Sequence, residues 1–519
     1  MFKIHPCGLF LRNKLLQLNF SYIFTKNYTS TIFALSSGKG KCGVAVIRIS
    51  GPASNLVMGK MAGLKKLPEP RKALLRQIRH PEKHELLDRG LVLWFPGPNS
   101  FTGEDSCELQ IHGGVAVISA VLDALAAIPG LRPAEPGEFT KRAFYSNKMD
   151  LTEAEGLADL IHAETEAQRK QALLQVEGSL YQRYSEWRDN LKRCIAHVEA
   201  YIDFSEDQNI EDDILQTTNS ELKLLTLKIQ AHLQDGRRGE RTRDGVKTVI
   251  VGAPNVGKSS LLNALCERPA AIVSATPGTT RDVVSSVLDI AGYPVLISDT
   301  AGLRDNTDDV IEREGIARAH QELGTADLML LVIDATFYQN WSDKNQEQNF
   351  LDFLKIYINT LKLEEAVLSC GNVQKLFGDK SHKVTDNVCL IVFNKLDLIE
   401  YKSLFYKVCR EYPECVTAVS CKDNGLLGPL IEKLTTSLEK LCGNPTRENA
   451  CLSQSRHRYH LTACVAALDR YLAMCGSERE IDQAAGQLRV AMNAIGHITG
   501  HVSTEQILDV IFKDFCIGK

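Results

Sequence analysis

The sequence has no run of about 18 or more apolar residues, the length that a helix needs to cross a membrane, so no membrane span is expected. None of its 15 cysteines pairs as Cys-x-x-Cys, and their number is odd. Neither a zinc site nor a disulfide framework is therefore indicated, which fits a reducing compartment. The formal net charge of −4 gives no global reason to expect nucleic-acid binding, so any contact with RNA must rest on a local patch or a partner protein.

Acidic residues are missing from the start of the chain, where the first one is Glu69. The leader of residues 1–30 places basic side chains between apolar and aromatic ones, namely Lys3, Arg12, Lys14 and Lys26. An acid-free basic leader that can form an amphipathic helix predicts a presequence for the mitochondrial matrix. The alternative is a disordered N-terminal tail.

Residues 31–150 have the composition of a folded α+β domain. Short apolar or alternating runs bounded by turn residues predict strands at Thr31–Leu35, Cys42–Ile49, Gly90–Phe95 and Glu108–His112. Val115–Ile128 is predicted to be a helix. Because charged groups usually lie in water, the physical pattern alone places three charged residues at the surface: Arg48, Glu108 and Lys148.

Residues 151–245 are predicted to be helical. Apolar residues at steps of three and four mark one face of a long helix: Leu180, Tyr184, Trp187, Leu191, Ile195 and Val198. Leu222–Leu233 continues this pattern. The basic run Arg237–Arg243 then joins the helices to the next part of the chain. Such a run is usually a solvated linker, and the alternative is a patch that neutralises RNA phosphates.

A phosphate-binding loop is predicted at Gly252-Ala-Pro-Asn-Val-Gly-Lys-Ser259, which has two glycines five apart and Lys and Ser after the second. It follows a predicted buried strand, Lys247–Val251, and precedes a predicted helix. In such a loop successive backbone N–H groups converge on phosphate oxygens, Lys258 reaches the outer phosphates and the Ser259 hydroxyl ligates magnesium.

Two later motifs supply further groups that phosphoryl transfer needs. Gly278-Thr-Thr-Arg-Asp282 precedes a predicted hairpin, and its Thr280 is in the position to give magnesium a second hydroxyl ligand. Asp299-Thr-Ala-Gly302 ends a predicted strand, with an acid to anchor the metal and a glycine N–H for the γ-phosphate. Loops held by these contacts relax when the γ-phosphate leaves, so the site is also a switch.

The base pocket is predicted at Asn394-Lys-Leu-Asp397 and Ser420-Cys-Lys422, which follow the predicted strands Val388–Phe393 and Val416–Val419. The Asp397 carboxylate accepts from the N1–H and 2-amino groups of guanine, and such sites discriminate by roughly 10⁴ or more. The nucleotide is therefore GTP, with these predicted binding residues: Asn255, Val256, Gly257, Lys258, Ser259, Ser260, Thr279, Thr280, Asp299, Gly302, Asn394, Lys395, Asp397, Ser420, Cys421 and Lys422.

Over residues 31–519 the chain resembles the tRNA-modification GTPases of the MnmE/TrmE type, specifically the mitochondrial form. Outside the nucleotide motifs the resemblance rests on Gly43–Gly51, Trp94–Asp105, Pro136–Phe139, Lys148–Leu151 and Phe515–Lys519. It implies a multidomain fold, α/β plus α, in which a Ras-like P-loop GTPase domain is inserted in a helical bundle. The resemblance implies three domains. Residues 31–150 form an α+β folate-binding and dimerisation domain, and residues 246–442 form the GTPase domain. The helical domain combines residues 151–245 with residues 443–519.

The resemblance implies that the N-terminal domain binds a tetrahydrofolate derivative, 5-formyl- or methylene-tetrahydrofolate, as the one-carbon carrier. The positions that match the family's folate-contacting residues are Arg48, Glu108, Lys148 and Lys519. The Cys-x-Gly-Lys ending implies a role for Cys516 at the modification site. On physical grounds alone, a cysteine so near the chain end is a packed or frayed thiol, and the sequence shows no base beside it.

The resemblance further implies that two GTPase domains dimerise across their nucleotide faces when potassium binds beside the phosphates, at Asn255, Ser274, Thr276 and Thr279. Leu303 stands where small GTPases carry the glutamine that orients the attacking water, so the cation supplies charge stabilisation instead. Glu312 matches the family's water-orienting acid, although physically it is equally the polar start of a helix. The predicted catalytic residues are Lys258, Thr280 and Glu312.

The predicted function is GTP hydrolysis coupled to modification of C5 of the wobble uridine (position 34) in mitochondrial tRNA. The implied partners are a second copy of the chain, an FAD-dependent protein of the MnmG/GidA type, and the tRNA. One alternative is a GTP-controlled assembly factor of the mitochondrial ribosome, but no separate RNA-binding domain such as KH is evident. Another is a signalling switch, which leaves the first 150 residues unexplained.

A long insertion, residues 335–387, separates the predicted strand Asp327–Asp334 from the strand at Val388. It exceeds an ordinary crossover. Asn340–Gln348 is expected to be disordered and Phe350–Leu363 helical. The sequence predicts no role for it.

Overall fold

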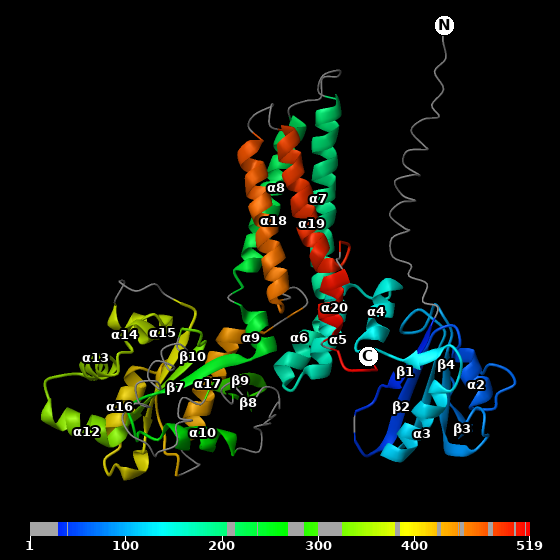
Figure 1. Cartoon of the computed structure of the whole chain (residues 1–519). Helices are drawn as coiled ribbons and strands as arrows, with labels where there is room; N and C mark the ends of the chain where they lie inside the picture. Colours follow the sequence, from blue (N-terminus) through cyan, green and yellow to red (C-terminus); the bar gives the residue numbers. More distant parts are fainter. Residues whose placement is uncertain are drawn as a thin grey trace, which may run out of the picture. The chain divides into compact units, whose positions relative to one another are not determined.

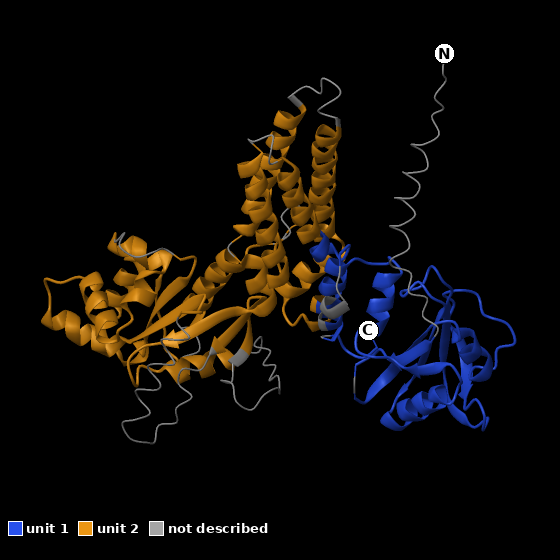
Figure 2. Cartoon of the chain, turned by 45° about the horizontal axis from the view of Figure 1, so that its top comes forward, with its two compact units in different colours: residues 1–158, 496–519 blue, residues 159–495 orange. Residues whose placement is uncertain are grey.

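The computed structural model describes residues 30–38, 40–204, 213–235, 237–267, 285–298, 324–378, 385–422, 427–444, 446, 451–475, 481–502, 505–513 and 515–518. The chain divides into two compact units, residues 1–158 with 496–519 and residues 159–495 (Figure 2). Except for Ser30, the predicted presequence lies outside the described residues. In the described parts no helix combines the length and apolar character that crossing a membrane requires. The sequence-based division into a presequence and three domains stays a prediction.

The first unit contains a six-stranded sheet with the order β3-β4-β5-β2-β1-β6 (Figure 1). Its strands are β1 (Thr31–Leu35), β2 (Cys42–Ser50), β3 (Leu74–Arg79), β4 (Leu86–Phe95), β5 (Ser106–Gly113) and β6 (Leu131–Pro133). The four predicted strands are present, and β3 and β6 are additional. No strand was predicted for β3, because Ile78 is its one buried residue and its side chains show no alternation.

Two helices, α2 and α3, cover one face of this sheet. The helices of the unit are α2 (Ser54–Lys60), α3 (Val115–Ala126), α4 (Glu138–Tyr145), the start of α5 (Leu151–His162), and α20 (Glu505–Lys513). Ile47 and Leu109 of the sheet pack with Met58 of α2 and Val121 of α3 in one apolar cluster. Because side chains alternate along a strand, Arg48 lies on the opposite face.

The C-terminal tail packs against the N-terminal strands within the same unit. Ile517 forms an isolated antiparallel bridge with Pro136, and Ser36 Oγ donates to the Gly518 carbonyl at 2.9 Å. A Cβ on Gly518 would lie 2.1 Å from the Leu35 carbonyl oxygen, so this approach requires glycine. The chain end is therefore held beside β1.

Helices from before and after the second sheet pack together in the second unit (Figure 1). They are α6 (Glu166–Val176), α7 (Ser179–Phe204), α8 (Asp213–Leu233), α18 (Ser455–Met474) and the greater part of α19 (Ile481–Thr499). The predicted apolar stripe from Leu180 to Val198 is buried throughout, which confirms a packed helix. Tyr471 of α18 donates its hydroxyl to Asn219 Oδ1 of α8 at 2.9 Å.

The prediction that Arg237–Arg243 is a solvated linker is wrong. The run forms a short helix, α9 (Arg238–Asp244), in which Arg241 is buried with its Nε 2.8 Å from Asp327 Oδ1. Two more of its arginines make ion pairs, Arg237 with Glu240 at 2.7 Å and Arg243 with Asp159 at 2.8 Å. Carboxylates of the same unit already neutralise these charges, which removes the support for an RNA-binding patch here.

The second sheet has the order β12-β11-β10-β7-β9-β8, with five parallel strands and β8 antiparallel to β9. The strands are β7 (Val246–Val251), β8 (Ser285–Ile290), β9 (Tyr293–Ser298), β10 (Leu328–Asp334), β11 (Val388–Asn394) and β12 (Val416–Ala418). Separate apolar clusters cover its two faces. One contains α10 (Lys258–Cys266) and α17 (Gly428–Cys442), and the other α16 (Ser403–Glu411) and the insertion.

The insertion is more helical than predicted. It forms α12 (Ala335–Lys344), α13 (Phe350–Thr360), α14 (Glu364–Leu368) and α15 (Gly371–Phe377). The predicted helix at Phe350 is present, but the expected disorder of Asn340–Gln348 is wrong because residues up to Lys344 continue α12. Asp334 caps that helix by accepting from the Thr336 N–H at 2.9 Å.

Candidate active site

Four loops meet at one edge of the second sheet. Parallel strands end at the same edge, and ligands of such sheets bind outside these carboxyl ends. The loop Gly252–Gly257 follows β7, Asp334 ends β10, Asn394 ends β11, and Ser420 follows β12. The predicted phosphate and base motifs are therefore neighbours in space.

Backbone geometry gives the loop after β7 the shape of a phosphate cradle. Asn255 and Gly257 have positive φ, at 59° and 96°, and α10 begins directly after Gly257. A Cβ on Gly252 would lie 2.3 Å from the Val332 carbonyl oxygen, and one on Gly257 would lie 2.2 Å from Asn394 Nδ2. Both glycines are thus required, and the first N–H groups of α10 point toward the loop, where they can meet an anion.

Lys258 lies across this cradle. Its Nζ donates to the carbonyls of Gly252 at 3.0 Å and Ala253 at 2.9 Å. Burial lowers the pKa of Lys258. Ser259 and Ser260 follow in the first turn of α10 and are exposed, so their hydroxyls are accessible to a ligand.

The loop after β11 is tied to the cradle by Lys395. Its Nζ donates to the Asn255 carbonyl at 2.6 Å and to Asp334 Oδ2 at 2.8 Å. Burial opposes ionisation of Asp334, but the hydrogen bonds from Lys395 and Thr336 outweigh it and lower the pKa of Asp334. Lys395 itself has φ 64°, a conformation that its surroundings must enforce.

Asn394 joins the loops after β7, β11 and β12 through its side-chain amide. Asn394 is buried, and its Nδ2 donates to the Val256 carbonyl at 2.9 Å. Its Oδ1 accepts from Cys421 Sγ at 3.2 Å. Burial raises the pKa of the Cys421 thiol, so it stays a protonated donor.

Asp397, the predicted base-recognition residue, is held by Ser420. Its Oδ1 accepts from Ser420 Oγ at 2.7 Å, and Ser420 is fully buried. The hydroxyl fixes one oxygen of a carboxylate that is otherwise exposed. An exposed carboxylate held in one orientation is suited to accept two N–H groups from a base edge, and Lys422 lies exposed in the next loop.

The remaining residues predicted for this site lie outside the described residues. They are Ser274, Thr276, Thr279, Thr280, Asp299, Gly302 and Glu312. Of the predicted magnesium and potassium ligands, Ser259 and Asn255 are described. The concave backbone, the Lys258 ammonium and the hydroxyls at the start of α10 fit a magnesium-bound nucleotide phosphate.

A second group of predicted residues gathers on the sheet of the first unit. Arg48 and Glu108 are paired residues of β2 and β5, with Arg48 Nε 3.1 Å from Glu108 Oε1. The Arg48 guanidinium lies 5.1 Å from the centre of the Phe101 ring and 5.9 Å from that of Phe139. The expectation of a solvated surface charge is wrong for Arg48 and Glu108, whose side chains are less than one-fifth exposed, and is confirmed for Lys148, which is exposed.

Lys148 borders the loop that carries Phe101. A Cβ on Gly103 would lie 3.7 Å from Lys148 Cε. Arg48 is also the register partner of Ala34 in β1, the strand whose end holds Gly518. The structure therefore brings Arg48, Glu108 and Lys148 to the same loop and strand region. Lys519 lies outside the described residues, and Cys516 is exposed.

Two family models together match nearly the whole chain after its leader, including the nucleotide site and Arg48, Glu108 and Lys148. Residues 31–148 match the family model described as the N-terminus of the GTP-binding protein TrmE, and residues 151–516 match the MnmE helical domain. The chain belongs to the MnmE/TrmE family of tRNA-modification GTPases.

Full-length relatives of this family agree. The chain is 51% identical over 495 residues to 5-taurinomethyluridine-[tRNA] synthase subunit GTPB3, mitochondrial, of Danio rerio, covering 94% of this chain and 93% of the relative. The human protein of the same name is 46% identical, with 94% and 93% covered. The tRNA modification GTPase MnmE of Parvibaculum lavamentivorans is 45% identical, with 94% and 100% covered.

One residue of this MnmE/TrmE site escaped the sequence analysis. Tyr357, in the insertion helix α13, accepts from the Ala253 N–H at 3.0 Å and donates to the Val332 carbonyl at 3.0 Å. Burial raises the pKa of Tyr357, so the phenol stays neutral. It links the phosphate loop to β10. Tyr357 lies 104 residues after Ala253, so no local sequence pattern indicated this contact. The sequence predicted only that this segment is helical.

We expect Tyr357→Phe to weaken GTP binding about five- to tenfold. The Ala253 N–H and the Val332 carbonyl each lose a hydrogen-bond partner, and together these losses are expected to cost about 1 kcal/mol of binding free energy. Tyr406→Phe is the matched control, since Tyr406 is 50% exposed on α16. Titration with a fluorescent GTP analogue measures the dissociation constant of each variant. An unchanged dissociation constant for Tyr357→Phe would show that the phenol does not position the loop.

The first unit contains a second residue that the sequence analysis missed. Arg142 is fully buried, with its Nη1 3.0 Å from Glu104 Oε2 and its Nη2 2.9 Å from Glu138 Oε1. Ser50 Oγ also donates to Glu104 at 2.7 Å. Burial opposes ionisation of Glu138, but hydrogen bonds from Arg132, the Glu135 backbone and Arg142 lower its pKa. Arg142 thereby anchors the loop beside Arg48.

Proposed function

We propose that this chain is the GTP-hydrolysing subunit of a complex that modifies C5 of the wobble uridine in mitochondrial tRNA. The observation that carries the nucleotide part is the contact of Lys395 with Asn255, which joins the base motif to the phosphate loop. The tRNA part is supported by the names of the relatives from Danio rerio and Homo sapiens. Those names also support taurinomethyl as the appended group.

The chain acts in mitochondria, as the names of these relatives indicate. We assign it to the matrix because tRNA modification takes place where the tRNA is. The acid-free basic leader of residues 1–30 supports import.

GTP hydrolysis relies on positioned charge. Lys258 and the start of α10 bind the phosphates, and magnesium, when bound, neutralises charge that develops on them. The proposed magnesium ligands are Ser259 and Thr280, with Asp299 behind them. Because Leu303 cannot orient water, we assign that task to Glu312, acting beside a potassium ion held by Asn255, Ser274, Thr276 and Thr279.

The first unit is proposed to bind 5-formyl- or methylene-tetrahydrofolate through Arg48, Glu108, Lys148 and Lys519. Glu108 supplies the carboxylate acceptor that an aminopyrimidine edge requires, and Arg48 Nε lies 3.1 Å from its Oε1. The aromatic rings of Phe101 and Phe139 beside Arg48 suit a flat heterocycle. Exposed Cys516 is proposed as a thiol at the modification site.

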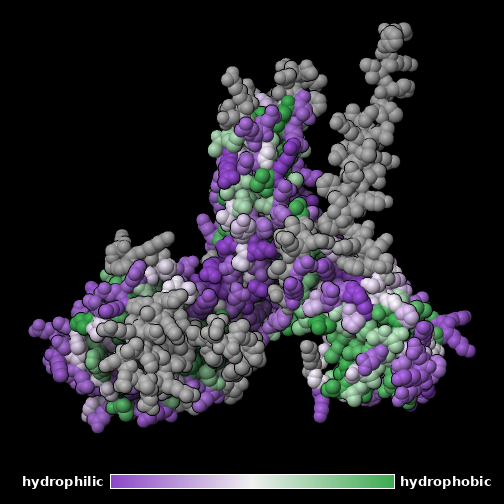
Figure 3. Space-filling view, viewed as in Figure 1, coloured by the Kyte–Doolittle hydropathy of each residue, from purple (hydrophilic) through white to green (hydrophobic). Residues whose placement is uncertain are grey.

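The proposed partners are a second copy of the chain, an FAD-dependent protein of the MnmG/GidA type, and tRNA. A second copy is supported by hydrophobic residues that gather on one visible face of the first unit (Figure 3). Val44 and Leu91, on the sheet face opposite α2 and α3, are 58% and 36% exposed. Exposed apolar surface of this kind favours association.

One experiment tests the proposal in two parts. GTP turnover by the purified chain is expected to be about tenfold or more faster in potassium than in sodium, because the cation stands in for an arginine finger. Wobble uridines of mitochondrial tRNA are expected to lose their C5 group when the protein is absent, as mass spectrometry would show. Equal rates in both salts would remove the cation mechanism, and unchanged uridines would favour ribosome assembly.

A further inference from the structure

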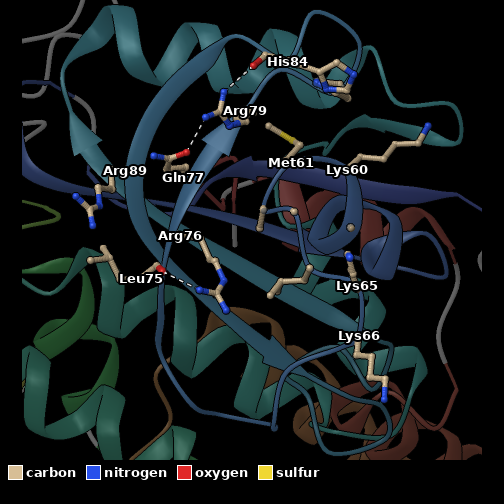
Figure 4. Close-up of a pocket in the computed structure, with 15 residues that line it drawn as sticks. Lys60, Met61, Lys65, Lys66, Leu75, Arg76, Gln77, Arg79, His84 and Arg89 are labelled. Atoms are coloured by element: carbon tan, nitrogen blue, oxygen red, sulfur yellow. Dashed lines mark hydrogen bonds between the residues drawn. The ribbon is translucent and has the colours of Figure 1, made fainter.

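A basic cleft opens along β3 on the first unit (Figure 4), and neither Arg48 nor Glu108 lines it. Its volume is about 790 Å³. Two segments form it, the end of α2 with the loop after it and the β3–β4 hairpin. The basic side chains that line it are Lys60, Lys65, Lys66, Arg76, Arg79 and Arg89.

No carboxylate lines this cleft. Among the described residues, none of the six cations makes an ion pair. The nearby acids have other positions or partners: Asp88 pairs with His112 at 2.8 Å and Glu69 with Lys72, while Glu82 and Glu85 lie in the turn between β3 and β4. The cleft therefore concentrates positive charge that the protein does not itself neutralise, on a chain whose net charge is −4.

Protection of an edge strand does not account for this charge. β3 is the edge of its sheet, and charged residues on an edge strand prevent pairing with other chains. That role explains Arg76 and Arg79, which belong to the strand. It does not explain Lys60, Lys65 and Lys66, which come from α2 and the following loop and line the opposite wall.

The two walls are fixed to each other. The Arg79 N–H donates to the Met61 carbonyl at 2.9 Å, which joins β3 to the end of α2. The Arg79 side chain is held by the His84 carbonyl at 3.0 Å and by Gln77 Oε1 at 2.7 Å, as the dashed lines of Figure 4 show. A guanidinium oriented in advance loses less entropy when it binds an anion.

We propose that this cleft binds the phosphate backbone of the tRNA substrate. Guanidinium and ammonium groups spread along an open cleft match the spaced charges of a polyanion. The cleft is lined mainly by exposed polar side chains, which favours backbone contacts over reading of individual bases. This inference rests on the proposed function, because it takes the RNA of that function as the occupant.

Charge removal tests it. The variant Lys60→Gln, Lys65→Gln, Arg76→Gln removes three exposed cleft charges without touching the bonds of Arg79. The control Lys192→Gln, Lys223→Gln, Lys407→Gln removes three exposed charges from the second unit. Binding of the full chain to fluorescein-labelled unmodified tRNA is measured by anisotropy between about 50 and 200 mM KCl. We expect about tenfold weaker binding for the cleft variant and a log–log salt slope reduced by about 2 to 3.

Both variants are also assayed for GTP turnover without tRNA, which is expected to match the wild type. Equal loss of tRNA binding in both variants, or no loss in the cleft variant, overturns the inference. So does retained tRNA binding with lost binding to anionic phospholipid vesicles, which would assign the cleft to a membrane surface. None of these results would contradict the proposed function. That function is contradicted instead if the wobble uridines of mitochondrial tRNA are unchanged when the protein is absent.

Discussion

Asp397→Asn is expected to change the nucleotide preference of the site from guanine to xanthine. In the proposed site, Asp397 would present acceptors to the N1–H and 2-amino groups of guanine, while Ser420 Oγ holds Oδ1 at 2.7 Å. Asparagine keeps an oxygen for Ser420 but places an N–H where guanine also carries one. Xanthine has a carbonyl at that position and accepts it. The mismatch is expected to cost roughly 10⁴ in GTP selectivity.

Competition between GTP and XTP, measured as kcat/KM for each, gives the ratio directly. Glu400→Gln is the matched control because Glu400 is an exposed acid a few residues further along the same loop. It is expected to leave the ratio unchanged. A variant Asp397→Asn that still prefers GTP would mean that Asp397 does not recognise the base.

The strands of the second sheet could be predicted from the sequence for a physical reason. Parallel strands buried on both faces are continuous apolar runs, as in Val388–Phe393, which lies entirely within β11. In contrast, β3 has one buried residue and no alternation, so nothing in its sequence separates it from a loop.

Contacts between residues distant in sequence account for the errors. The arginines of α9 were visible, but their partners Asp159 and Asp327 lie 84 and 86 residues away, so the run resembled a solvated linker. Likewise, Asn340–Gln348 is polar, yet its first residues continue a helix capped by Asp334 and packed through Tyr338 and Trp341.

The residues of the candidate site also fall into those that the sequence predicted and those that it did not. Motif residues such as Lys258, Lys395 and Asp397 are recognisable because each chemistry needs a fixed local spacing. Tyr357 and Arg142 act through hydrogen bonds to groups far along the chain, such as the Ala253 N–H and the Glu104 carboxylate. No local pattern marks such residues, so the sequence alone did not indicate their roles.

The buried pair Arg241–Asp327 carries the largest expected effect on stability. Arg241 Nε lies 2.8 Å from Asp327 Oδ1, and the two side chains are 7% and 9% exposed. Asp327 Oδ2 also accepts from the Lys247 N–H at 3.2 Å, so this carboxylate joins α9 to the start of β7. We expect Arg241→Met to lower the free energy of unfolding by about 3–5 kcal/mol, because it leaves a buried carboxylate without its cation.

The double variant Arg241→Met, Asp327→Asn separates the ion pair from simple packing. Asparagine still accepts from Lys247, and no unpaired charge remains, so the double variant is expected to be more stable than Arg241→Met alone. Urea unfolding midpoints of the single and double variants measure this. Arg169→Met, which removes the exposed partner of Glu166, is the control and is expected to leave the midpoint unchanged. If the double variant is no more stable than Arg241→Met, lost packing of the arginine stem, rather than the stranded charge of Asp327, accounts for the destabilisation.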